Sequence, residues 1–261
     1  MRRGFQTGGF IHLAARIVSI LGLVAACLPS LESQTRDEVT VVCAAAGSRG
    51  ARARESIASA FGNGFTTTTT AATSAALPTT LGGVTVTVKD SSAAELRAQL
   101  YFVSPQQINF VVPRLARTGP ATVTTSGQRN LTGSLVVEDV APGIFTANAD
   151  GKGVPAATAL RIGQGGSRAD VPVFRLDQER KQQVPVPIDM GWETDEVHLI
   201  LYGTGIRNRT SLNAVTAQVG DEVVPVQFAG AQPAYPGFDQ VNVRLPRSLI
   251  GRGEVSLVLT V

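Results

Sequence analysis

The sequence predicts an all-β protein built from two tandem β-sandwiches, and three observations carry that prediction. The composition is low in charge and rich in turn residues, with 16% Asp, Glu, Lys and Arg, 27 Gly and 14 Pro among 261 residues. Short segments of alternating polarity are separated by Gly and Pro along most of the chain. The pattern of these segments occurs twice. Repeated short strands are typical of antiparallel sandwiches, and so little charge leaves little material for long solvated helices.

The duplication is clearest in two pairs of segments. Residues 56–65 and 198–206 are both strand-like and both end in the order aromatic, Gly, any residue, Gly, apolar. Residues 107–113, which read QINFVVP, are matched by residues 240–246, which read QVNVRLP. A chain of this length can hold two domains of ordinary size. We therefore expect two immunoglobulin-like sandwiches, one for each copy.

The patterns divide the chain into five segments. In order, these are a signal peptide or lipoprotein signal (1–33), a lead-in with a first strand (34–54), the first immunoglobulin-like sandwich (55–146), a strand-rich connector (147–190) and the second sandwich (191–261).

Within the first sandwich, strands are expected at residues 84–88, 100–103, 108–112, 119–124 and 134–137, where apolar residues alternate or run together between turn residues. The connector contains strand-like pieces at 156–161, 171–176 and 184–188. The strand candidates of the second sandwich lie at 197–201, 214–219, 223–228, 240–245 and 254–261.

The N-terminal segment has the features of an export signal. Arginines precede an apolar run at residues 17–28, which is too short to span a bilayer core of about 30 Å but suits the core of a signal peptide. The run contains LVAAC, which resembles the lipobox that places a lipidated Cys27 at the mature N-terminus; the alternative is ordinary cleavage near Ser33. We expect a secreted or cell-envelope protein, lipid-anchored if Cys27 is the cleavage residue, with no transmembrane helix in the mature chain.

The two copies differ at their ends. The first continues to Phe145, whereas the second stops within its matching run, from Glu254 to Val261. The last strand of the second sandwich is therefore expected to be missing, through truncation of the sequence or because a partner donates that strand at this edge. Exposing three aliphatic side chains forfeits about 1.5–3 kcal/mol each. That sum is comparable with the whole stability of a domain, about 5–15 kcal/mol.

A family resemblance is carried by five segments within residues 55–261, namely 56–64, 102–109, 140–145, 201–205 and 238–246. In these segments the chain resembles the Solibacter-type uncharacterised C-terminal domain family of exported bacterial modules, which is related to the IPT/TIG immunoglobulin-like fold. The resemblance implies a secreted or surface module. It implies no activity and supplies no site residues.

Residue types used in catalysis do not cluster in the sequence. The histidines are His12, in the predicted signal, and His198, in a predicted strand. Catalysis usually needs several converging His, Cys or carboxylate groups, and no Gly-x-Ser-x-Gly motif is present. Gly203 and Gly205 begin a dinucleotide-like pattern, but Asn208 replaces its third glycine. We expect no enzyme and no cofactor, unless His198 lies beside a carboxylate in a cleft.

Two weaker binding hypotheses centre on residues near position 190. A group of carboxylates beside Trp192 allows a calcium site between the domains, although a solvated loop is the simpler interpretation. Its members are Asp189, Glu193, Asp195 and Glu196. Trp192 and Tyr235 could stack on sugars if both are exposed on one face, and this hypothesis fails if both are buried.

The combined interpretation is a non-catalytic exported module that binds an unknown protein or polysaccharide at the cell surface or outside the cell. The alternatives are a carbohydrate-binding module and an accessory domain associated with a hydrolase. Despite the net charge of +3, arginines are scattered without a basic stripe, so nucleic-acid binding is not predicted. The expected contact surfaces are the 66–76 loop, the 233–237 turn and the edge at 254–261.

Overall fold

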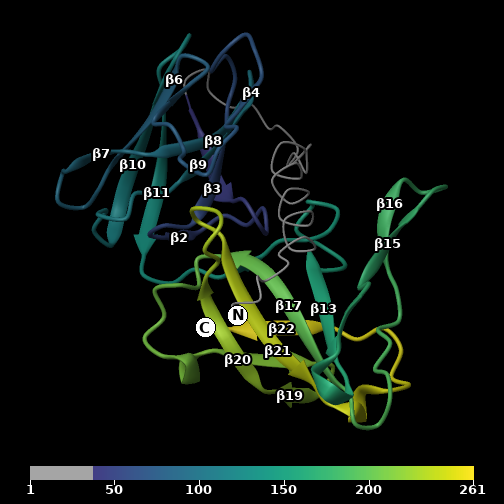
Figure 1. Cartoon of the computed structure of the whole chain (residues 1–261). Coiled ribbons are helices and arrows are strands. Elements are labelled where there is room, and N and C mark those ends of the chain that lie inside the picture. The colour runs from purple at the N-terminus through teal and green to yellow at the C-terminus, as the bar shows by residue number, and fades with distance from the viewer. Residues whose placement is uncertain (1–37) are drawn as a thin grey trace, which may run out of the picture.

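The computed structural model describes residues 38–261, which form two β-sandwiches side by side (Figure 1). Within this range the helical elements are three 3-10 turns, η1 (Gln164–Gly166), η2 (Leu212–Ala214) and η3 (Arg247–Leu249). The all-β prediction is therefore confirmed. The predicted signal at 1–33, with Cys27, lies outside the described residues. Residues 38–261 contain no helix with the length and apolar character that crossing a bilayer requires.

The first sandwich consists of a five-stranded and a six-stranded sheet. The first sheet has the order β1 (Thr40–Cys43), β3 (Ile57–Phe61), β9 (Gln107–Val111), β8 (Gln99–Val103) and β4 (Thr70–Ala71). The second has the order β2 (Ala51–Ala53), β11 (Leu131–Glu138), β10 (Gly119–Ser126), β6 (Val84–Lys89) and β5 (Thr80–Leu81), with β7 (Glu95–Arg97) also paired to β6.

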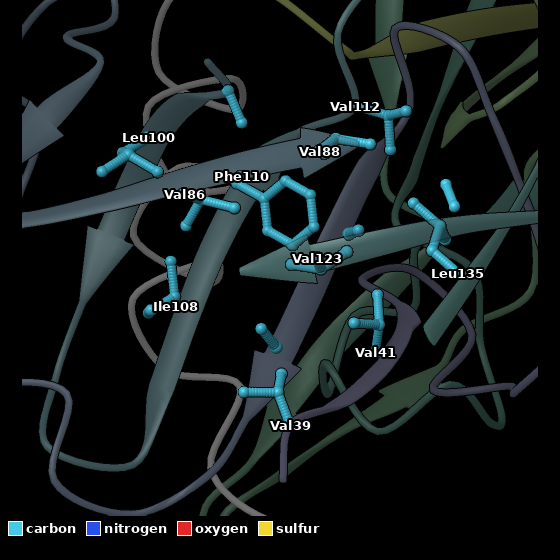
Figure 2. Close-up of a cluster of buried hydrophobic side chains, with 14 of the residues drawn as sticks. Val39, Val41, Val86, Val88, Leu100, Ile108, Phe110, Val112, Val123 and Leu135 are labelled. Atoms are coloured by element: carbon cyan, nitrogen blue, oxygen red, sulfur yellow. The ribbon is translucent and has the colours of Figure 1, made fainter. Parts of the chain in front are cut away.

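The core of the first sandwich follows from alternation along its strands. In β6 three valines are buried, whereas the threonines between them are only half-buried. Figure 2 shows two of these, Val86 and Val88, beside Phe110 of β9 and Val123 of β10. Among residues 38–261, two partly buried hydrophobic residues pack against this core. Its two sheets therefore cover each other almost completely.

The second sandwich consists of a six-stranded and a three-stranded sheet. The larger has the order β14 (Arg168–Val171), β13 (Ala157–Ile162), β17 (Glu196–Thr204), β21 (Asp239–Leu245) and β20 (Val226–Ala231), with β12 (Gly143–Ile144) also paired to β17. The smaller has the order β19 (Glu222–Val224), β18 (Thr216–Val219) and β22 (Leu257–Thr260). A separate hairpin of β15 (Phe174–Asp177) and β16 (Gln182–Pro185) extends from the second sandwich (Figure 1).

The second sandwich extends into the range predicted as connector. Strand β13 pairs with β17 along six residues, and β14 pairs with β13. Ala157 and Ala159 alternate into the second core, which fixes β13 in this sheet. The sequence pattern predicted a strand at 156–161 but assigned it to the connector, because the small alanine side chains gave a weak signal for burial in the second core.

The duplicated sequence pattern corresponds to duplicated topology. The order β1–β3–β9–β8 matches β13–β17–β21–β20, and the pair β6–β10 matches β18–β22. The shared Gln-x-Asn motif makes the same contact in both copies. Nε2 of Gln107 donates to Oδ1 of Asn109 at 2.9 Å, and Nε2 of Gln240 donates to Oδ1 of Asn242 at 2.8 Å.

The Gly203-x-Gly205 segment is a structural turn. Gly205 has a φ of +78°, which favours glycine, and an added Cβ would overlap the carbonyl oxygen of Ala141. The buried carboxylate of Asp239 accepts the Ile206 N–H at 2.6 Å and Nε–H of Arg207 at 2.7 Å. Burial raises the pKa of Asp239, and Arg207 opposes that shift. These contacts explain the glycine pattern without a dinucleotide.

A third apolar cluster joins the two sandwiches. It includes Ile57 and Tyr101 of the first sandwich and Tyr202 and Phe238 of the second. The ring of Phe238 stacks on Phe145 at 5.0 Å between centroids and meets the edge of Tyr101 at 6.2 Å. The outer face of β17 is therefore buried against the first sandwich rather than exposed to solvent.

Within this cluster, hydrogen bonds of Thr204 connect the two sandwiches. Its hydroxyl accepts the Ile57 N–H at 2.8 Å and donates to the Gly237 carbonyl at 2.7 Å. Nearby, the Tyr101 hydroxyl donates to the Pro236 carbonyl at 2.5 Å. The 233–237 turn was expected to present a contact surface; the structure places Pro236 and Gly237 against the first sandwich and leaves Pro233 and Ala234 exposed.

Replacing Thr204 with Val should lower the free energy of unfolding by about 1–3 kcal/mol, because the buried Ile57 N–H loses its acceptor. Urea unfolding followed by circular dichroism measures this change. Thr216→Val, at an exposed position on β18, is the matched control and should unfold like the native chain. Equal midpoints for the two variants would show that the Thr204 contact does not connect the sandwiches.

A second polar contact closes the first sandwich at one end. The Asp90 carboxylate accepts the backbone N–H groups of Ser92 at 2.9 Å, Ala94 at 3.1 Å and Arg117 at 2.8 Å. The Ser92 hydroxyl also donates to it, at 2.7 Å. These bonds, led by that of Arg117, lower the pKa of Asp90 to about 2.

Because this pKa is depressed, Asp90 stabilises the fold above its ordinary pKa of 3.8, and the contribution is lost as pH falls toward 2. Asp90→Asn should therefore lower the urea midpoint at pH 7, and its difference from the native chain should narrow between pH 4 and about 2. Glu179→Gln, in the exposed turn of the β15–β16 hairpin, is the control. A constant difference at all pH values would contradict the assigned role of the carboxylate.

Candidate functional site

The strand β22 is an open edge of the second sandwich. It pairs antiparallel with β18, from Thr216 opposite Thr260 to Val219 opposite Leu257, and with no other strand of residues 38–261. Its counterpart β10 is flanked on both sides, by β6 and β11. The position that β11 takes in the first sandwich is thus unfilled in the second within the described chain. The backbone N–H and C=O groups on the side of β22 away from β18 are therefore available for pairing with another strand.

The core beneath β22 is incompletely covered. Leu257 and Leu259 pack against the second core but stay partly exposed, whereas Val123 and Thr125 of β10 are fully buried. Within the described part of the chain, eleven partly buried hydrophobic residues pack against the second core, compared with two around the first. Partly exposed apolar residues are therefore more numerous around the core of the second sandwich, which also has the open edge.

The β22 edge lacks the features that usually prevent edge pairing. Strand β14, at the edge of the larger sheet, carries Arg168 and Asp170, and β20 at its other edge has a bulge between Val226 and Phe228. Charges, prolines and bulges of this kind discourage another strand from adding. Strand β22 reads LVLT, with no charge and no proline. Its chemistry favours the addition of a further strand.

Trp192 lies in a second candidate region, on a loop whose backbone is held in place. Its side chain is 83% exposed. The Trp192 N–H donates to Oδ2 of Asp195 at 3.2 Å, and the Asp195 N–H donates to the Trp192 carbonyl at 2.9 Å. Nη1 of Arg247 donates to the carbonyls of Met190 at 3.0 Å and Trp192 at 2.8 Å. Hydrogen bonds therefore hold the backbone of the loop, while the indole faces solvent.

A polar cleft of about 610 Å³ opens beside this indole. It lies between the 192–195 loop and the segment that runs through η1 into β14. Its lining residues are Arg161, Gly163, Gln164, Ser167, Arg168, Ala169, Trp192, Glu193, Thr194 and Asp195. Nε2 of Gln164 donates to Oγ1 of Thr194 at 3.4 Å and links the two sides.

The predicted acidic group does not converge on a metal position. Asp189 and Asp195 both pair with Arg161, the second at 3.6 Å, and hydrogen bonds from the Gly191 N–H and then Arg161 lower the pKa of Asp189. Glu196 pairs with Arg244 at 3.1 Å instead. Within residues 38–261 no group of three or more His, Cys, Asp or Glu side chains is placed to hold a metal. The structure therefore does not assemble the calcium site that Asp189, Glu193, Asp195 and Glu196 suggested.

His198 does have a carboxylate beside it, but outside the cleft. Its Nε2 lies 3.5 Å from Oε2 of Glu196, and its Nδ1 lies 2.6 Å from Oε1 of Gln227. These groups come from β17 and β20 of the same sheet. His198 does not line the cleft at Trp192, so the arrangement required for the enzymatic alternative is not formed there.

Tyr235 and Trp192 do not form a paired platform. Tyr235 is half-buried, and its ring lies 5.9 Å from that of Phe238 in the cluster between the sandwiches. The sugar-stacking hypothesis required both side chains to be exposed on one face, and of the two Trp192 is exposed. The polar residues around it, from the η1 segment and Arg161, gave no signal in the sequence because their proximity depends on the pairing of β13 with β14 and β17.

No protein-family model matches this chain, and no curated protein matches it. The resemblance to the Solibacter-type family therefore stays a prediction from the sequence.

Trp192→Ala should leave the free energy of unfolding within about 0.5 kcal/mol of the native value, because the indole packs against little. Gly191→Ala should destabilise more, because Gly191 has a φ of +63° and an added Cβ would overlap Oδ2 of Asp195. Urea unfolding followed by circular dichroism compares the two variants. A loss above 2 kcal/mol in Trp192→Ala, or none in Gly191→Ala, would contradict this account of the loop.

Proposed function

We propose that this chain is a non-catalytic, exported interaction module of the cell surface or extracellular space that binds a protein partner by accepting a strand at β22. The observation that carries the proposal is the open edge of β22 above a half-covered core. Export is supported by the N-terminal sequence and by the resemblance to the Solibacter-type family of exported modules. Strand addition is an established mode of protein recognition, in which backbone pairing gives affinity and alternate side chains give specificity.

The first sandwich supplies a template for the donated strand. There β11 runs antiparallel to β10, with Leu135 opposite Ala121 and Val137 opposite Gly119. Both of these β11 side chains are buried in the first core. By the same geometry, the donor at β22 is antiparallel and carries apolar side chains at every second position. Those side chains would cover Leu257 and Leu259.

A peptide that copies residues 131–138 should raise the melting temperature of the full chain. Binding to the folded state alone stabilises by about 2.7 kcal/mol when the free peptide is at 100 times its dissociation constant. Differential scanning fluorimetry at increasing peptide concentration measures the shift. A peptide of the same composition with the apolar alternation scrambled is the control and should give no shift.

Two substitutions on β22 test whether the peptide-induced shift depends on the side of the strand that the donor would cover. Leu259→Lys should abolish the peptide-induced shift, because it places a charge on the face that the donor covers. Val258→Lys, on the opposite face with 52% exposure, should preserve the shift. Circular dichroism checks that both variants fold, and Leu259→Ala replaces Leu259→Lys if that variant does not. Absence of a shift with the native chain, or an equal shift with all variants, would overturn the proposal.

A further inference from the structure

We propose that the cleft beside Trp192 is a saccharide-binding site, separate from the strand-accepting edge. This inference goes beyond the proposed function, because the site and its ligand class both differ from those at β22. It rests on the exposure of the indole, the rigidity of its loop and the charge pattern of the cleft lining.

The exposed indole provides the apolar contact. Trp192 is the single tryptophan of the chain and is 83% exposed, whereas Tyr101, Phe110 and Phe238 are buried. A tryptophan side chain can bury about 150–250 Å² against a partner. The indole stands at the wall of a cleft, so a flat apolar face and a hollow lined by polar groups are available to one ligand.

The backbone under the indole is pre-organised. The Arg247 guanidinium donates to three successive carbonyls, those of Met190, Gly191 and Trp192, at 2.8–3.2 Å. An added Cβ at Gly191 would lie 2.6 Å from Cδ of Arg161, so the loop packs tightly onto the floor of the cleft. A ligand that enters the cleft therefore does not have to order this loop, which lowers the entropic cost of binding.

The charges around the cleft balance. Two arginines, Arg161 and Arg168, face two carboxylates, Glu193 and Asp195. A small anion would be repelled by the carboxylates, and a metal cation by the guanidinium groups. Sugar hydroxyls fit both kinds of group, because each hydroxyl can donate to a carboxylate and accept from a guanidinium or an amide. The apolar C–H face of the same ring can cover the indole.

Two of these charged groups are available to a ligand. Arg168 and Glu193 are exposed, and their side chains make no hydrogen bond or ion pair with another residue of 38–261. Arg161, by contrast, is held by Asp189 and Asp195 at the floor. The volume of about 610 Å³ falls within the range of small-molecule sites, about 300–1,000 Å³. The geometry therefore suits the end of an oligosaccharide, stacked on Trp192 and bonded by Arg168 and Glu193.

Because Trp192 is the single tryptophan, its fluorescence reports directly on the site. The full chain is titrated with five soluble polysaccharides, namely laminarin, dextran, mannan, xylan and polygalacturonate, and with an oligoarginine peptide. We expect a saturable change in indole emission with at least one polysaccharide and none with the peptide. No change with any polysaccharide, or a change with the peptide alone, would overturn the inference.

Affinity electrophoresis in gels that contain the responding polysaccharide then tests the residues. Trp192→Ala should weaken retardation roughly tenfold or more, a loss of about 1.4 kcal/mol, and Arg168→Ala and Glu193→Gln should each weaken it less. Leu115→Ala, which removes another exposed apolar side chain, and Leu259→Lys should both bind like the native chain. The Leu259→Lys result distinguishes this site from the β22 interface. Retardation that persists in Trp192→Ala would overturn the inference.

Discussion

Alternating apolar side chains on a strand must be covered by a facing layer, and this constraint organises the whole molecule. The first sandwich satisfies it with sheets of five and six strands. The larger sheet of the second sandwich is covered on its outer face by the cluster around Phe238, which joins it to the first sandwich. Its inner face meets the three strands of the smaller sheet, and within residues 38–261 the cover there is incomplete. The open edge at β22 is thus a consequence of the same packing rule that builds the rest of the fold.

Much of this architecture could be predicted from the sequence because it depends on local period-two patterns. The strict alternation of β6 and the repeated Gln-x-Asn segments placed strands that the structure confirms. Strand β17 does not show this simple alternation. Leu199 and Leu201 enter the second core, while Ile200 and Tyr202 enter the cluster between the sandwiches, so the strand is apolar on both faces. The sequence could not show what covers the second face, because that contact comes from β3, β8 and β9 of the other sandwich.

The binding regions were only partly predictable for a related reason. The residue type and position of Trp192 made it a candidate, and its exposure agrees with that interpretation. The role of Arg161, which neutralises Asp189 and Asp195, depends on β13 packing beside the 191–195 loop. The clamp from Arg247 joins residues more than 50 positions apart. The sequence suggested a metal site at these carboxylates. Because Arg161 pairs with Asp189 and Asp195, the structure instead has a polar cleft with these ion pairs at its floor.

Amide hydrogen exchange of the full chain tests the central claim most directly, by comparing β22 with β10. The two strands hold equivalent positions, but among the strands of residues 38–261 β10 is paired on both sides and β22 on one. We expect the β22 amides that face the open edge to exchange rapidly in the free chain and to become protected when the 131–138 peptide is added. Protection of all β22 amides as strong as that of β10, with no peptide present, would contradict an open acceptor edge.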